Sequence, residues 1–202
     1  LENTHNAAGG AAHEPSTVAA AARAAREHDV PVHLDGARLW NAAVAHGEPL
    51  AAFTDPVDSV MCSLSKGLGA PVGSILAGSE EFIERAHRNR KLLGGGWRQA
   101  GIIAAPGLYA LDARERLAED HRRAKTLATG LAEIAGLTVD EPETNIVLVE
   151  TDEPASAVLE ACEDEGVLGV PFDEHTVRFC THLDVDDEDV RDAIEAVERA
   201  LA

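Results

Sequence analysis

The sequence predicts an α/β fold, in which a mixed or largely parallel sheet is followed by a smaller α+β unit. Short apolar runs alternate with helical patterns over residues 1–110, and this alternation is typical of parallel or mixed sheets covered by helices. From about Leu111 a long charged amphipathic pattern leads into shorter strands. With 202 residues the chain can bury a sizeable core. We therefore expect one domain boundary, between residues 1–110 and 111–202.

The elements of the first part follow from local signals. Ser16 is a good N-cap directly after Pro15, so a helix is expected to begin there. The β-branched and apolar runs bounded by polar residues are expected to form strands. In chain order we expect a helix over 16–27, a strand over 30–35, a helix over 38–46, a strand over 59–64, a strand over 74–77, and helices over 80–92 and 97–109.

The second part begins with a long amphipathic helix and ends with another. The last helix is expected to be capped by Asp186 or Asp187, and its apolar residues recur on one face at helical spacing. In order we expect a helix over 111–134, strands over 137–139 and 145–150, a helix over 155–165, a strand over 176–180 and a helix over 187–201. Two units joined by a long helix is the expected arrangement.

Charge and cysteine content narrow the functional classes. The net charge is −19, from 36 acidic residues against 17 Lys and Arg, which argues against nucleic acid or an anionic membrane as a partner. No apolar stretch approaches the roughly 18–20 residues of a membrane span, and no targeting segment is recognisable. The three cysteines show no metal or disulfide spacing, so buried reduced thiols and no metal site are expected. We expect a cytoplasmic protein.

The acidic surface carries few lysines. Only Lys66, Lys91 and Lys125 occur, which resembles proteins from a high-salt cytoplasm, where ions screen the repulsion between carboxylates. We therefore expect a halophilic protein. On such a surface, each lysine that remains has a higher chance of being required for chemistry.

Asp35 and Lys66 lie at the carboxyl ends of two predicted strands. Ligands of open α/β sheets bind beyond those ends. A lysine followed by Gly67, Gly69 and Gly73, with a carboxylate on the neighbouring strand, is what a Schiff-base cofactor site needs. A lysine after a strand is, however, more often only a surface charge. Spacing alone leaves both interpretations open.

Five sequence motifs resemble the threonine aldolase family of pyridoxal-phosphate enzymes, in order and spacing. They are LENTHN at 1–6, HLDGAR at 33–38, SLSKGLGAPVGS at 63–74, RK followed by GGGWRQ at 90–99, and VR followed by THLDV at 177–185. The resemblance spans the chain. It implies fold type I of the pyridoxal-phosphate enzymes, with residues 1–110 as half of the cofactor-binding large domain and 111–202 as the small domain.

The resemblance assigns the cofactor residues. Lys66 matches the lysine that holds the pyridoxal phosphate, and Asp35 matches the aspartate paired with the pyridine nitrogen. Arg38 resembles an active-site arginine close to cofactor and substrate, although a salt bridge to an acidic neighbour would also explain it. Lys91 and Arg98 resemble residues near the substrate and the cofactor phosphate, and surface charge is an equal alternative for both.

Two further residues are assigned to the substrate. Arg178 looks like the arginine that binds the amino-acid carboxylate, for which a planar guanidinium is well suited. His5 resembles the histidine near the substrate hydroxyl, where it would assist removal of a proton; a solvated loop histidine is the alternative.

The implied reaction is retro-aldol cleavage of threonine or a related β-hydroxy amino acid to glycine and an aldehyde, by a homo-oligomer. Another β-eliminating lyase of the same cofactor class, or a catalytically silent fragment, is the alternative. In the family a segment precedes the LENTHN motif and supplies a phosphate-binding turn and a ring-stacking histidine. We expect exposed strand edges and apolar surface where such a segment packs.

Overall fold

The computed structural model describes all 202 residues, and the chain forms two compact units. The first contains Leu1–His5 and Ala12–Arg116, and the second contains Asn6–Ala11 and Leu117–Ala202. These limits differ from the expected ranges in two places, because the first unit continues past residue 110 and because residues 6–11 pack with the second unit. The assignment of the two ranges to domains of a larger enzyme stays a prediction.

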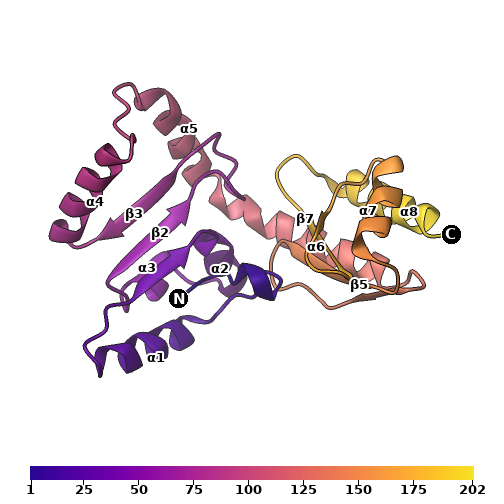
Figure 1. Ribbon diagram of the computed structural model, residues 1–202, viewed down its shortest axis with the longest axis horizontal. Coiled ribbons are helices and arrows are strands. Elements are labelled where there is room, and N and C mark those ends of the chain that lie inside the picture. The colour runs from indigo at the N-terminus through magenta and orange to yellow at the C-terminus, as the bar shows by residue number, and fades with distance from the viewer. The chain divides into compact units, whose positions relative to one another are not determined.

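The first unit is built on a mixed three-stranded sheet, as predicted. Its strands are β1 (His33–Gly36), β2 (Ser59–Ser63) and β3 (Ser74–Gly78), in the order β1-β2-β3. Strand β1 pairs with β2 in parallel and β3 pairs with β2 in antiparallel orientation. Figure 1 shows β2 and β3 side by side.

Helices cover this sheet unevenly. Helices α1 (Pro15–Arg26), α2 (Leu39–His46) and α3 (Leu50–Thr54) pack together with β1 and β2, whereas α4 (Glu80–Leu92) lies against β3 and α5 (Gly101–Asp112) ends near the turn that closes the unit. The buried core consists of Ala12, Val18, Leu34, Leu39, Ala42, Phe53, Val60 and Cys62. This core supports β1 and β2, the strands that precede Asp35 and Lys66.

Two boundaries in the first unit differ from the prediction. Helix α1 begins at Pro15 rather than at Ser16, and its N-cap Glu14 makes no side-chain cap bond; proline suits the first helical position because its missing N–H has no partner there anyway. The strand expected from Val30 begins only at His33. The Val30 N–H donates to the Ala25 carbonyl at the end of α1, so it takes no part in the sheet. The short helix α3 was not predicted.

The prediction of one continuous helix over 111–134 is wrong, because a turn divides this range between two helices. Helix α5 ends at Asp112, a 3₁₀ turn covers Arg114–Arg116, and α6 runs over Leu117–Leu131. The Arg114 guanidinium donates to the Leu111 carbonyl at 3.0 Å and satisfies an acceptor of the ending helix. The amphipathic pattern continues through this break and conceals it.

The second unit contains an antiparallel four-stranded sheet. Its strands are β4 (Leu137–Val139), β5 (Ile146–Thr151), β6 (Val170–Pro171) and β7 (Thr176–Cys180), in the order β4-β5-β7-β6. All pairs are antiparallel. The two-residue β6 was not predicted from the sequence, because so short a strand has no periodicity.

The two faces of this sheet have different neighbours. Side chains of β5 and β7 that face α6, α7 (Ala155–Asp164) and α8 (Asp187–Ala200) form the core together with them. On the opposite face lie Ile146 and Leu148, which contact Gly10 and Gly9 of the segment 6–11. The Thr144 hydroxyl also donates to the Gly10 carbonyl at 2.8 Å. These contacts explain why residues 6–11 belong to this unit.

Helix α8 confirms the predicted cap. The Asp186 side chain accepts hydrogen bonds from the Glu188 and Asp189 N–H groups, and the Asp189 side chain accepts from the Asp186 N–H in a capping box. Among the cysteines, Cys62 and Cys162 are buried and reduced as expected, but Cys180 is exposed, because it ends β7 on the face away from the core. None of the helices has the length and apolar character that crossing a membrane requires.

Candidate active site

Lys66 lies in a tight loop that directly follows β2. Backbone hydrogen bonds close this loop, from the Leu64 N–H to the Gly73 carbonyl at 2.9 Å and from the Gly69 N–H to the Lys66 carbonyl at 2.8 Å. Gly69 has a φ of +77° and Gly73 a φ of +120°, which side chains rarely allow. The glycines after Lys66 are therefore needed to form the turn that presents its amine.

A residue distant in the sequence also holds this loop. The guanidinium of Arg116, in the 3₁₀ turn after α5, donates a hydrogen bond to the Gly67 carbonyl. Arg116 is 49 residues from Gly67, and no local pattern in the sequence indicates this contact. The prediction therefore missed it.

Asp35 lies next to Lys66 because β1 and β2 are parallel. The register pairs Asp35 with Met61, so the carboxyl ends of both strands reach the same edge of the sheet. One Asp35 carboxylate oxygen accepts from the Ala37 N–H at 3.0 Å, and the side chain is exposed. The second oxygen of the carboxylate can therefore accept from a ligand.

Three charges act on the Lys66 amine. Desolvation, followed by the positive charge of Arg38, lowers its pKa, and the carboxylates of Asp35 and Glu2 oppose that effect without cancelling it. A lowered pKa increases the share of free amine, which is the form that attacks an aldehyde. The predicted residues Lys66, Asp35 and Arg38 thus lie in one site.

Cys62 lies beside this site, and its thiol is poorly suited to act as a nucleophile. Burial, followed by the charge of Asp35, raises the pKa of its thiol to about 11. The thiol is therefore protonated near neutral pH, whereas a reactive cysteine needs the thiolate.

His5 lies at the first turn of the chain, with a carboxylate close by. Its Nε2 is 3.7 Å from an oxygen of Glu2, and its ring centroid is 6.4 Å from that of His13. The side chain of His5 is 40% exposed, so a ligand can reach it. Glu2 belongs to the LENTHN motif, but the sequence analysis assigns it no role. Its spacing of three residues from His5 is the signal that indicates the contact.

Lys91 and Arg98 lie outside this cluster. Lys91 is in the last turn of α4 and Arg98 is in the segment between α4 and α5, and both side chains are exposed. The charges that act on Lys66 are those of Arg38, Asp35 and Glu2. The assignment of Lys91 and Arg98 to substrate and cofactor stays a prediction.

Arg178 belongs to the second unit, on β7. Its Nη1 donates to the Asn6 side-chain oxygen at 3.2 Å, while its Nε is buried and has no hydrogen-bond partner. A buried donor without a partner costs about 1–3 kcal/mol, so a group that accepted from Nε would relieve this cost. A carboxylate is such a group.

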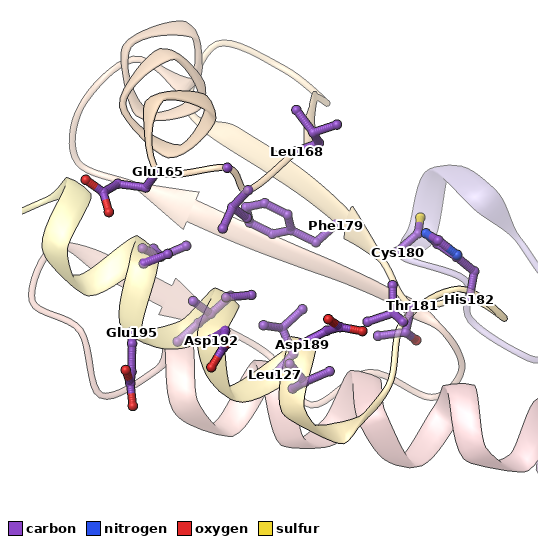
Figure 2. Close-up of a pocket in the computed structure, with 18 of the residues that line it drawn as sticks. Leu127, Glu165, Leu168, Phe179, Cys180, Thr181, His182, Asp189, Asp192 and Glu195 are labelled. Atoms are coloured by element: carbon purple, nitrogen blue, oxygen red, sulfur yellow. The ribbon is translucent and has the colours of Figure 1, made fainter.

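The second unit also holds a cavity of about 560 Å³, between β7, α6 and α8. Figure 2 shows Phe179 and Leu127 among its lining residues, with Asp189 and Asp192 of α8 nearby. None of the predicted site residues lines it. The cavity is therefore separate from the residues for which chemistry is predicted.

The chain has the fold of the fold type I pyridoxal-phosphate enzymes. A solved structure of threonine aldolase from Leishmania major superposes on 100% of this chain and 60% of its own with a TM-score of 0.79, at 20% identity. An N-acetylornithine aminotransferase from Stenotrophomonas maltophilia K279a gives a TM-score of 0.71 over 100% of this chain and 55% of its own, at 20% identity. At such identities the likeness establishes the fold only.

The chain belongs to the β-eliminating lyase family, whose model matches residues 1–154. A low specificity L-threonine aldolase from Escherichia coli strain K12 is 44% identical over 93% of this chain and 55% of its own length. A low-specificity L-threonine aldolase 1 from Arabidopsis thaliana is 37% identical over 100% of this chain and 58% of its own. The chain thus spans between half and two thirds of the length of these relatives.

Proposed function

We propose that the protein is a pyridoxal-phosphate lyase that cleaves L-threonine, L-allo-threonine or a related β-hydroxy amino acid into glycine and an aldehyde. The observation that carries this proposal is the placement of Lys66, with its lowered pKa, beside Asp35 at the shared edge of β1 and β2. The names of the relatives from Escherichia coli and Arabidopsis thaliana support the substrate class.

The residues of the site fit the proposed cofactor. Pyridoxal phosphate, when bound, supplies an aldehyde for a lysine amine and a ring that accepts the electron pair released by bond cleavage. Lys66 would hold it through its amine, and Asp35 would accept a hydrogen bond from the protonated ring nitrogen. Arg38 and Arg98 would add positive charge for the anionic parts of the cofactor.

Other residues would act on the substrate. Arg178 would bind the α-carboxylate with two parallel donors, one of them the unpaired Nε, and Arg38 and Lys91 would add positive charge. His5 would accept the proton of the β-hydroxyl, either directly or through a water. Loss of that proton allows the oxygen to form a carbonyl while the Cα–Cβ bond breaks, which releases an aldehyde. Return of a proton to Cα then gives glycine.

Product analysis after incubation with threonine tests the reaction. We expect glycine and acetaldehyde in equal amounts, and no turnover in Lys66→Ala. A 2-oxo acid with ammonia would instead show elimination, the alternative that the family name allows.

Asp35→Asn tests the role of the carboxylate in the same assay. The variant keeps the shape of the side chain but loses the charged acceptor, and a hydrogen bond to a charged group contributes roughly 1.5–3 kcal/mol. We expect kcat to fall about 10- to 100-fold. An unchanged kcat would remove Asp35 from the mechanism.

We also propose that the protein is a homo-oligomer. All five residues of β3 are exposed at the edge of its sheet. Exposed large apolar residues concentrate in the same part of the chain, at Val72, Ile75, Leu76, Leu92, Leu93, Trp97, Ile102, Leu108 and Tyr109. Apolar surface of this kind is typical of interaction sites, and either another subunit or the segment that precedes the LENTHN motif in the family would cover it. A cytoplasmic location and a contribution to glycine synthesis remain part of the same proposal.

A further inference from the structure

Glu2 is held at the edge of the sheet beside Asp35. The backbones of the two residues form a parallel bridge, in which the Asp35 N–H donates to the Leu1 carbonyl at 2.8 Å and the Asn3 N–H donates to the Asp35 carbonyl at 2.9 Å. Residues paired in this way project their side chains to the same side of a sheet. The first three residues thus extend the sheet and set the direction of the Glu2 side chain.

The turn that follows Glu2 is rigid. Asn3 is fully buried, and its side-chain amide exchanges two hydrogen bonds of 3.0 Å with the backbone of His13. Thr4 is also buried. Because these two residues fix the turn, the 3.7 Å contact between the Glu2 carboxylate and the His5 Nε2 is set by the fold and not by a mobile chain end.

The charge of Glu2 also acts on Lys66, from the side of the sheet to which the Asp35 side chain projects. Its charge acts on Lys66 in the same direction as that of Asp35 and against that of Arg38. Its side chain is 35% exposed, so the interaction is only partly screened. One carboxylate thus acts on both His5 and Lys66, the two residues that are proposed to exchange protons or bonds with the substrate and cofactor.

We propose that Glu2 is a further residue of the active site, a positioning carboxylate that orients the His5 imidazole through Nε2 and whose charge acts on Lys66 alongside that of Asp35. This inference rests on the proposed function for the meaning of His5 and Lys66. The carboxylate near Nε2 favours a proton on that nitrogen, which leaves Nδ1 to accept a proton from the substrate hydroxyl. Glu2 itself exchanges no proton with the substrate.

The contact with Lys66 can be measured without cofactor or substrate. The chain has only three lysines, so reductive methylation with ¹³C-formaldehyde should give three dimethyl-lysine NMR signals besides the signal of the α-amine. The Lys66 signal is assigned from a Lys66→Arg sample. Removing the Glu2 charge removes a stabilising partner of the ammonium. We therefore expect Glu2→Gln to lower the titration midpoint of Lys66.

The other lysines and a second glutamate provide the controls. Lys125 is ion-paired with Glu141 at 2.8 Å in the other unit, so its midpoint should be unchanged in Glu2→Gln. Glu48 is an exposed glutamate of the first unit, and Glu48→Gln should leave all three midpoints in place. A Lys66 midpoint that is the same in Glu2→Gln and in the wild type overturns the inference, whatever the fate of the proposed function.

A double-mutant cycle tests whether Glu2 acts through His5. We expect His5→Asn to lower kcat about 100-fold and Glu2→Gln about 10-fold, each with little change in KM, and Glu2→Asp to recover part of the loss. If Glu2 acts through His5, the double variant is no slower than His5→Asn alone. Losses that multiply to about 1,000-fold would show independent roles and overturn the positioning role.

Discussion

At the scale of single residues, the site depends on opposing charges around one amine. Arg38 lowers the pKa of Lys66, while Asp35 and Glu2 raise it. The net lowering favours the free amine that the proposed chemistry needs, and the two carboxylates remain available to hold a cationic ring nitrogen and a histidine. Removing the positive charge of Arg38 should therefore raise the pKa of Lys66, and removing the negative charge of Asp35 or Glu2 should lower it.

Arg38→Met should raise the pKa of Lys66. The variant removes the positive charge that disfavours the ammonium, so the pH at which half of the amine is free should move upward, opposite to the change in Glu2→Gln. The ¹³C-methyl signal of Lys66 measures this directly. Arg88→Met, at an exposed position of α4, is the matched control and should leave the signal unchanged. A downward shift in Arg38→Met would contradict the described arrangement.

The placement of Asp35 and Lys66 at one edge of the sheet could be predicted from the sequence, whereas the contacts that support the site could not. Asp35 and Lys66 follow strands whose apolar pattern is clear, so their shared edge could be predicted. The bond from Arg116 to Gly67 joins residues far apart in the sequence. Glu2 and His5 are close in the sequence, but their contact depends on the turn that Asn3 fixes against His13. Such contacts require the folded chain.

At the scale of elements, α6 carries an unusual buried histidine. His121 is 7% exposed, and burial, followed by the charge of Lys125, lowers its pKa to about 4. In the unfolded chain a histidine titrates near 6.5, so the unfolded state binds more protons between these values. Stability contributed by neutral His121 is present above pH 6.5 and is lost as the pH falls toward 4.

His121→Gln should reduce the pH dependence of stability. Chemical unfolding of the wild type should show a free energy of unfolding that falls between pH 6.5 and pH 5, where few carboxylates titrate. The full effect of His121 would reach at most about 3 kcal/mol near pH 4. The variant should have a flatter profile over that range even if it is less stable throughout. Parallel profiles for both proteins would show that His121 is not the titrating group.

The predicted helices and strands are wrong where the local sequence pattern and the packing of the folded chain disagree. Helices and strands with clear periodicity, such as α4, β2 and α8, lie where the sequence places them. The break between α5 and α6 was missed because the amphipathic pattern continues through it. Strand β6 has two residues and α3 has five, and elements of this length form because neighbouring elements pack against them.

At the scale of the whole molecule, charge is the dominant property. The net charge is −19 on 202 residues, and the carboxylates repel one another more strongly in the compact folded state than in the unfolded chain. We expect the melting temperature to rise as potassium chloride increases, because salt screens this repulsion. Differential scanning fluorimetry over a salt series measures it, with a net-neutral protein of similar size as control. A melting temperature indifferent to salt would contradict the proposed salt adaptation.

The central claim is that Lys66 holds pyridoxal phosphate, and one labelling experiment tests it most directly. The protein is incubated with pyridoxal phosphate in high salt and reduced with borohydride, and the modified peptide is then located by mass spectrometry. We expect the label on Lys66, with Lys91 and Lys125 unmodified and the label lost in Lys66→Arg. Modification of Lys91 or Lys125 to the same extent as Lys66, or a label that persists in Lys66→Arg, would contradict the assignment of the active site.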